Sequence, residues 1–285
     1  MDILYLIILG LGVVVVTRFV LCEGIERLAA ATNLSSKTKG QILGYSTSLP
    51  ELVGTASTAW LGLLGAGLWN IAASNIINLG LFVAANIYFK QHRALTEKKF
   101  LDEAGFAVGA ILIPLVLVFG GGAEQSIWTA VLLFAAFLIY LVADKKLNRV
   151  SCKTTDGDAG ETEGSHESQP VEEVAKTRVI VGAVSMILAG LGLVILLGHF
   201  LGGSAERVVR TMGIPQVGVG WILGVATSLP ELTSFFSIYG VAKKKGRLGS
   251  HYDTQEALDN LAASNMSNLG LVYPIGIILF ILAGH

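Results

Sequence analysis

The hexapeptide TSLPEL occurs twice in this chain, as Thr47–Leu52 and again as Thr227–Leu232, at an offset of 180 residues. A second block, Asn70–Leu81 (NIAASNIINLGL), recurs as Asn260–Leu271 (NLAASNMSNLGL) at an offset of 190 residues, with nine of its twelve positions identical. Blocks that recur in the same order indicate an internal duplication. We therefore interpret the chain as two copies of one unit.

The composition indicates that both copies lie in a membrane. Of the 285 residues, 53% are hydrophobic and 14% are charged, and the mean hydropathy is +0.65. A soluble domain has about 25% charged residues, so these values exclude an ordinary soluble enzyme. The net charge of −1 provides no basic field for nucleic acid. Cys22 and Cys152 are too few for a disulfide framework and have no metal-site spacing.

Eight stretches are long and apolar enough to cross a bilayer, because a spanning helix needs about 20 mostly apolar residues. We therefore predict an all-α polytopic membrane protein with eight transmembrane helices, five in the first copy and three in the second. The expected organisation is a first repeat (1–143), an acidic linker (144–177) and a shortened second repeat (178–285). The predicted spans are Ile3–Leu21, Gln41–Leu64, Leu68–Tyr88, Ala104–Gly121, Ile127–Ala143, Val179–Phe200, Val217–Val241 and Leu258–Ala283.

The distribution of basic residues predicts the orientation. If the N-terminus is outside, 17 of the 20 lysine and arginine residues fall in loops on the inner side, as the positive-inside rule requires. We expect an integral protein of the plasma (inner) membrane, with its linker in the cytoplasm. Equivalent points of the two copies are separated by five spans. Because each span takes the chain to the other side of the membrane, an odd number inserts the second copy in the opposite orientation. Inverted repeats are typical of secondary transporters, whose substrate sites lie near the midplane.

Glu51 and Glu231 are the only acidic residues well inside a predicted span, and they occupy the same repeat position. A carboxylate at this depth costs several kcal/mol and therefore indicates a functional site. Each glutamate follows a proline, which breaks the helix and frees backbone carbonyls near Thr47–Ser48 and Thr227–Ser228. Carboxylates, hydroxyls and free carbonyls suit calcium, sodium or magnesium rather than zinc or copper.

The second block adds neutral oxygen atoms. Ser74 and Asn78 are four residues apart and share one helix face, and Ser264 and Asn268 repeat this arrangement. Two carboxylates balance one divalent cation, or bind monovalent ions or protons in succession, as antiport requires. The competing interpretation is that these polar residues only hold helices together. It is weaker for two symmetric glutamates than for the individual serines and asparagines.

The paired Ser-Leu-Pro-Glu and Ser-Asn-x-x-Asn blocks resemble the cation/calcium antiporter superfamily, in particular its sodium/calcium exchanger branch. The resemblance covers both halves and implies sodium-driven calcium exchange by alternating access, with both ions as substrates and no organic cofactor. It implies that Glu51 and Glu231 are the central ligands and that the first and sixth spans are sliding gate helices. The remaining oxygen ligands that it implies are Thr47, Ser48, Thr227, Ser228, Ser74, Asn78, Ser264 and Asn268.

The chain departs from the family pattern in two ways. Members usually have five spans in each half, whereas this chain stops after three spans of the second half. A homodimer, another partner or a truncated reading frame could account for the missing pair. Some exchangers also have an acid at the position of Asn268, so this pocket has only two carboxylates. That could change the sodium-to-calcium ratio or indicate coupling to another cation or to protons.

Three functions remain open from the sequence. They are a sodium/calcium antiporter, a calcium or other cation/proton antiporter, and a transport-inactive family member that serves as a binding or regulatory subunit. The chain has no Walker A loop and no His-Glu-x-x-His motif. Ser48 and Ser228 have no nearby histidine in the sequence to form a hydrolase triad. We therefore do not expect an enzyme.

Overall fold

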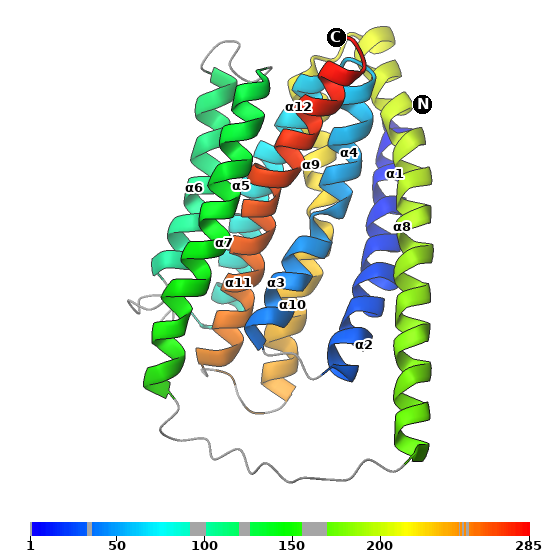
Figure 1. Ribbon diagram of the computed structural model, residues 1–285. Coiled ribbons are helices and arrows are strands. Elements are labelled where there is room, and N and C mark those ends of the chain that lie inside the picture. The colour runs from blue at the N-terminus through cyan, green and yellow to red at the C-terminus, as the bar shows by residue number, and fades with distance from the viewer. Residues whose placement is uncertain are drawn as a thin grey trace.

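The computed structural model describes residues 2–32, 36–91, 101–119, 126–155, 170–244, 246, 248 and 251–285. All regular secondary structure in these ranges is helical (Figure 1), which confirms the all-α prediction. Within these ranges, six helical segments are long and apolar enough to cross a membrane. They are Asp2–Leu28, Leu64–Tyr88, Ile127–Asp144, Thr177–Met212, Gln216–Lys244 and Asp253–Leu282.

The two other expected spans, 41–64 and 104–121, also fall on helices, the second as far as residue 119, where the described range ends. The first coincides with α3 (Ser36–Thr47) and α4 (Leu49–Trp60), and the second with α6 (Leu101–Phe119). Neither is among the six segments that meet the criteria of length and hydropathy. The count of eight spans and the outside position of the N-terminus therefore remain predictions.

The expected linker is only partly described. Helix α7 (Ile127–Thr155) enters it from one side, and α8 (Pro170–Met212) begins within it on the other. The acidic residues 156–169 lie outside the described ranges. Five of the basic loop residues that predicted the orientation also lie outside them, namely Arg93, Lys98, Lys99, Lys245 and Arg247.

Equivalent helices of the two copies run in opposite directions (Figure 1). Helices α3 and α4 run toward the end of the bundle that holds both termini. Their equivalents, α9 (Gln216–Thr227) and α10 (Leu229–Lys244), run away from that end. The first helix, formed by α1 (Asp2–Val16), a π-helical turn (Thr17–Cys22) and α2 (Glu23–Ala31), likewise runs opposite to α8. The duplication is therefore inverted, as the sequence predicts.

The outer surface of the bundle is apolar. Helices α7 and α8 expose Leu132, Ile139, Leu188 and Ile195, each with more than 60% of its surface accessible. Polar side chains are instead buried between the helices. A large apolar surface around a polar interior is unfavourable in water but matches a lipid environment.

Each copy packs its broken helix against the other copy. Helix α3 lies along α11 (His251–Ser267), and α9 lies along α5 (Leu64–Tyr88). Two equivalent glycines permit this approach. A Cβ atom at Gly44 would lie 2.6 Å from the carbonyl oxygen of Asn260, and one at Gly224 would lie 2.6 Å from Cβ of Ala73. The helices therefore meet at backbone contact next to both TSLPEL segments.

We expect Gly44→Ala and Gly224→Ala to destabilise the protein, because the added methyl group overpacks the contact at a cost of about 1–3 kcal/mol. Gly240→Ala is the matched control, since no atom lies within 4 Å of its added Cβ. In a helix this control gains about 1 kcal/mol of propensity. Thermal unfolding in detergent should show lower midpoints for the first two variants and an unchanged or higher one for Gly240→Ala. Equal midpoints would contradict the packing argument.

Candidate ion-binding site

Both TSLPEL segments interrupt their helices at the same serine. Helix α3 ends at Thr47 and α4 begins at Leu49, whereas α9 ends at Thr227 and α10 begins at Leu229. The backbone angles of the intervening residues are nearly identical, with φ −80° and ψ −2° at Ser48 and φ −81° and ψ 0° at Ser228. The following prolines cannot donate the hydrogen bond that would continue the helix. The breaks therefore occur where the sequence predicts them.

The two glutamates follow the breaks directly and face the interior. Glu51 lies in the first turn of α4 and Glu231 in the first turn of α10, and both are fully buried. Neither side chain points toward the lipid. The carboxylate of Glu231 is close enough to that of Glu51 to repel it electrostatically. Two acidic side chains are thus held close together in the interior of the bundle.

Glu231 lies among hydroxyl groups from both copies. Ser264 Oγ donates a hydrogen bond of 3.0 Å to Glu231 Oε1. The hydroxyl oxygens of Ser48 and Ser264 are 3.1 Å apart, so a residue of the first copy also lies next to the group that binds Glu231. The Thr47 hydroxyl also interacts with the Glu231 carboxylate. Residues of α3, α10 and α11 therefore converge on one carboxylate.

Glu51 has the corresponding surroundings. The hydroxyls of Ser74 and Thr227 lie near its carboxylate without forming a hydrogen bond with either oxygen, and they are 3.3 Å from each other. Thr227 Oγ1 donates to Asn70 Oδ1 at 3.2 Å, and Asn70 Nδ2 donates to the backbone oxygen of Glu51 at 3.4 Å. Asn70 is not among the ligands predicted from the sequence, although its recurrence as Asn260 could have indicated it.

Asparagine side chains join the second-block helices α5 and α11. Asn78 Nδ2 donates to Asn265 Oδ1 at 3.2 Å, and Asn268 Nδ2 donates to Asn75 Oδ1 at 2.9 Å. Asn75 and Asn265 also donate to each other's backbone oxygens, at 3.4 and 3.3 Å. These reciprocal bonds fix the two copies around an approximate twofold axis. The NH₂ groups of Asn78 and Asn268 donate to residues of the other repeat. Their Oδ1 atoms therefore remain available to bind an ion.

Several buried oxygen atoms at this centre have no hydrogen-bond partner within the described ranges. Burying such an atom unsatisfied costs about 1–3 kcal/mol. A cluster of unsatisfied acceptors, two of them on carboxylates, matches what a cation requires. The atoms are Glu51 Oε1 and Oε2, Glu231 Oε2, Ser228 Oγ, and Oδ1 of Asn78, Asn260 and Asn268.

The ten site residues predicted from the sequence are all buried in the bundle interior. Nine of them take part in the contacts described above. Ser228 differs, because its hydroxyl is buried at the helix break without a hydrogen bond. The structure adds Asn70 and Asn260 to the predicted set, together with Asn75 and Asn265.

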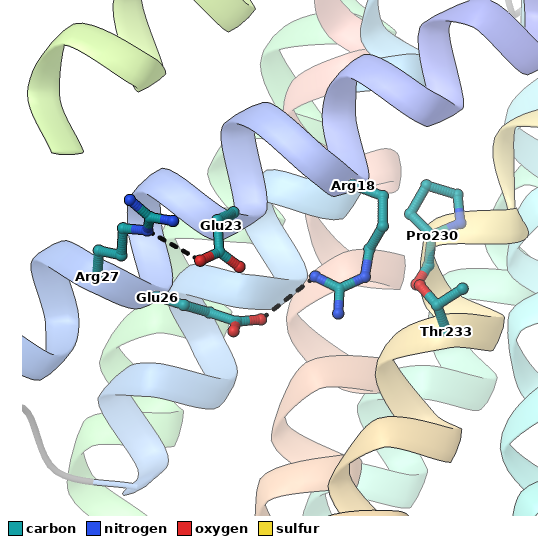
Figure 2. A network of polar contacts seen from close by, with 6 residues as sticks. All are labelled: Arg18, Glu23, Glu26, Arg27, Pro230 and Thr233. Carbon is teal, nitrogen blue, oxygen red and sulfur yellow. Dashed lines mark hydrogen bonds and ion pairs between the residues drawn. The ribbon is translucent and has the colours of Figure 1, made fainter. Parts of the chain in front are cut away.

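An arginine lies beside the helix that holds Glu231. Arg18, in the π-helical turn of the first helix, forms an ion pair of 3.4 Å with Glu26. Figure 2 shows its guanidinium group beside the turn of α10 that contains Pro230 and Thr233. A second pair, of 2.8 Å, joins Arg27 and Glu23 on the same helix. Charges within a membrane are usually paired in this way, and Glu26 balances the charge of Arg18 close to the site.

A cavity of about 640 Å³ lies beside the contact between α4 and α8, on the side of the termini. Val53 and Ser57 line it from α4, and Gly198 and Glu206 line it from α8. Val53 is two residues from Glu51, so its side chain leaves α4 on the other side, and the cavity lies on the face of α4 away from the buried carboxylate.

Two oppositely oriented helical copies with oxygen atoms gathered between them define the architecture of a secondary transporter. The chain belongs to the family described as sodium/calcium exchanger protein, whose profile matches residues 3–144 and 182–284. The two matched segments correspond to the two copies. The protein is therefore a helical membrane transporter of the exchanger type, a class of cation antiporters, and the resemblance seen in the sequence is confirmed.

Individual relatives agree with this assignment. A candidate antiporter of Alkalimonas amylolytica, CaxA, is 26% identical over 266 residues, which cover 92% of this chain and 75% of the relative. An uncharacterized membrane protein of Methanocaldococcus jannaschii is 28% identical over 141 residues, or 49% of this chain and 44% of that protein. A solved structure of the sodium-calcium exchanger NCX_Mj, soaked with sodium and strontium, superposes with a TM-score of 0.52 at 24% identity. That match covers 98% of this chain and 83% of the exchanger, and it shows the common fold.

We expect a cysteine at position 57 to react with a membrane-impermeant thiol reagent added from the side of the termini, because Ser57 lines the cavity. Ser234→Cys is the control, since Ser234 is buried in α10. Both substitutions are made after Cys22 and Cys152 are replaced by alanine. Mass spectrometry should show modification of Ser57→Cys only. Equal modification of the two variants would contradict access through this cavity.

Proposed function

We propose that this protein exchanges sodium for calcium across the membrane by alternating access, and that both ions bind at Glu51 and Glu231 near the bilayer midplane. The single observation that supports this most strongly is the group of buried, unpartnered oxygens around two carboxylates. The family assignment supports a cation antiporter. The identity of the ions rests on the chemistry of the site.

The ligand set suits calcium. A calcium ion takes six to eight oxygen ligands and accepts carboxylate, amide, hydroxyl and backbone oxygens together. Glu51 and Glu231 supply two negative charges, which balance one calcium ion. Ser228, Asn78 and Asn268 contribute neutral oxygens that lack other partners. The same oxygens can hold sodium ions, which are of similar size and hardness.

Charge balance would also make the exchange obligatory. An empty site would leave two ionised carboxylates in a low-dielectric interior, a state that is very costly without a counter-ion. A conformational change that closes the site is therefore favourable only when calcium or sodium occupies it. After calcium or sodium leaves on one side of the membrane, an ion of the other kind must bind before the site can close and open again to the first side.

The first helix and α8 are the elements that would move. They lie side by side along one flank of the bundle (Figure 1). Only 17% of the most apolar stretch of α8 is buried, against 61% for the segment Asp253–Leu282. The inner face of α8 packs closely on α4, where a Cβ atom at Gly202 would lie 2.7 Å from Cβ of Ser57, so a sliding motion would pass over this contact. The cavity between α4 and α8 would open and close with this motion.

The topology follows from the same proposal. We place eight spans in the inner membrane, with the N-terminus outside and residues 156–169 in the cytoplasm. The two copies, 1–143 and 178–285, flank the linker 144–177. Family matches that end at residue 144 and resume at residue 182 support these boundaries.

Calcium uptake into liposomes that contain the purified protein tests the proposed ion pair. We expect uptake when sodium is trapped inside and diluted outside, because outward sodium flow then drives calcium inward. Uptake driven only by a pH gradient would replace the proposal with cation/proton antiport, which the neutral Asn268 would fit. No uptake under either gradient, from correctly inserted protein, would contradict a transport function.

We expect Glu51→Gln and Glu231→Gln each to reduce calcium uptake to the level of empty liposomes. Glutamine keeps the size of the side chain but removes one of the two charges that balance calcium, so folding and insertion should persist. Glu23→Gln is the control, because Glu23 lies in an exposed ion pair with Arg27. Uptake at the wild-type rate in either site variant would refute its role.

A further inference from the structure

Three acidic side chains outside the central site converge near the end of the bundle opposite the termini. Glu103 comes from α6, Asp144 from α7 and Asp259 from α11. Each offers a carboxylate oxygen, and these oxygens all lie within 4.8 Å of one another. The three residues are only 2%, 6% and 2% exposed, respectively. Acidic side chains usually lie apart from one another on the solvent-exposed surface, whereas these three are buried close together.

The cluster is separate from the central site but lies on the same helix. Asp259 precedes Ser264 on α11 by five residues, which corresponds to about 7.5 Å along the helix axis. Ser264 binds Glu231 directly. An ion held by Asp259 would therefore lie about one and a half turns from the central carboxylates.

Two glutamine side chains orient the acidic oxygens. Gln255 Nε2 donates to Glu103 Oε1 at 2.8 Å and to Asp259 Oδ1 at 3.0 Å. Gln41 Nε2 donates to Asp144 Oδ2 at 2.7 Å. Donors that face a carboxylate favour its ionised form. Burial opposes the charge of Glu103 more strongly than these donors support it, so the ionised cluster requires a counter-ion.

One oxygen of the cluster has no partner. Glu103 Oε2 is buried and accepts no hydrogen bond from any residue that the structure describes. Asp102, the preceding residue, can share a hydrogen bond with the Glu103 carboxyl when one of the two acids is protonated, and it repels Glu103 when both are ionised. A buried carboxylate oxygen with no donor and with acidic neighbours is best satisfied by a positive charge.

Neutral oxygens complete the surroundings. The phenol groups of Tyr45 and Tyr140 lie close enough to interact electrostatically with Asp144 and Asp259. The amides of Gln41 and Gln255 each have a carbonyl oxygen that cannot bond to a carboxylate but can bind a cation. Carboxylate, amide and phenol oxygens are all hard ligands of the kind that calcium accepts.

We propose that Glu103, Asp144 and Asp259 form a second cation site, for a divalent ion of the calcium class, distinct from the pair Glu51 and Glu231. The site joins α6 and α7 of the first copy to α11 of the second. Occupancy would therefore clamp the helix that holds Ser264 against the first copy. The inference does not depend on which ions the central site exchanges.

Calcium binding to the full-length protein in nanodiscs tests this site directly. The double variant Glu51→Gln/Glu231→Gln removes the central charges, so any remaining site is seen alone. We expect radiolabelled calcium to bind this variant with a stoichiometry of about one ion per chain. Adding Asp144→Asn or Glu103→Gln should weaken that binding at least tenfold, whereas adding Glu23→Gln should leave it unchanged. Absence of binding to the double variant would overturn the proposal, and so would binding that these substitutions do not affect.

Thermal unfolding midpoints show whether a variant that does not bind calcium is still folded. In the double variant, calcium should raise the unfolding midpoint in a saturable manner. With Asp144→Asn added, the midpoint without calcium should be no lower, because the repulsion is relieved, and calcium should no longer raise it. A double variant that is stabilised by acidification but not by calcium would show that protons neutralise the cluster, which contradicts a cation site. The calcium binding and unfolding results test the second site independently of whether the Glu51 and Glu231 variants transport calcium.

Discussion

Two carboxylates that are buried near each other in the centre of the bundle are the constraint on which this structure depends. Glu51 and Glu231 are completely buried, and both oxygens of Glu51 have no hydrogen-bond partner in the described part of the chain. Such a pair is unfavourable unless a positive charge joins it. The broken helices, the hydroxyl groups and the asparagine amides all serve to hold these charges at one place and to leave oxygen atoms directed at it.

The inverted duplication explains how a short motif builds the whole site. Each TSLPEL segment breaks its helix at a serine, and each broken helix packs on the second-block helix of the other copy through Gly44 or Gly224. Neither copy can complete the site alone, because Glu231 is bound by Ser264 of its own copy and approached by Ser48 of the other. A site made from both copies can open toward either side when the copies exchange conformations, which is the basis of alternating access.

The sequence predicts the local features of the site well, because proline and buried acid have strong local effects. Pro50 and Pro230 determine the helix breaks, and the repeat predicts the opposed orientation of the copies. Contacts between distant segments are less accessible to such reasoning. Asn75 and Asn265 cannot be recognised as a reciprocal pair from spacing. The cluster of Glu103, Asp144 and Asp259 combines residues from three separate helices, and only the fold brings them together.

The most direct test of the central claim is the position of a calcium-like ion in crystals of this protein. Strontium can replace calcium and is located by its anomalous scattering. The account predicts one strong peak bridging the carboxylates of Glu51 and Glu231, lost when the crystals are transferred to high sodium. If no peak lay between these carboxylates, and the strontium bound elsewhere or the two glutamates shared a hydrogen bond, the account would be contradicted.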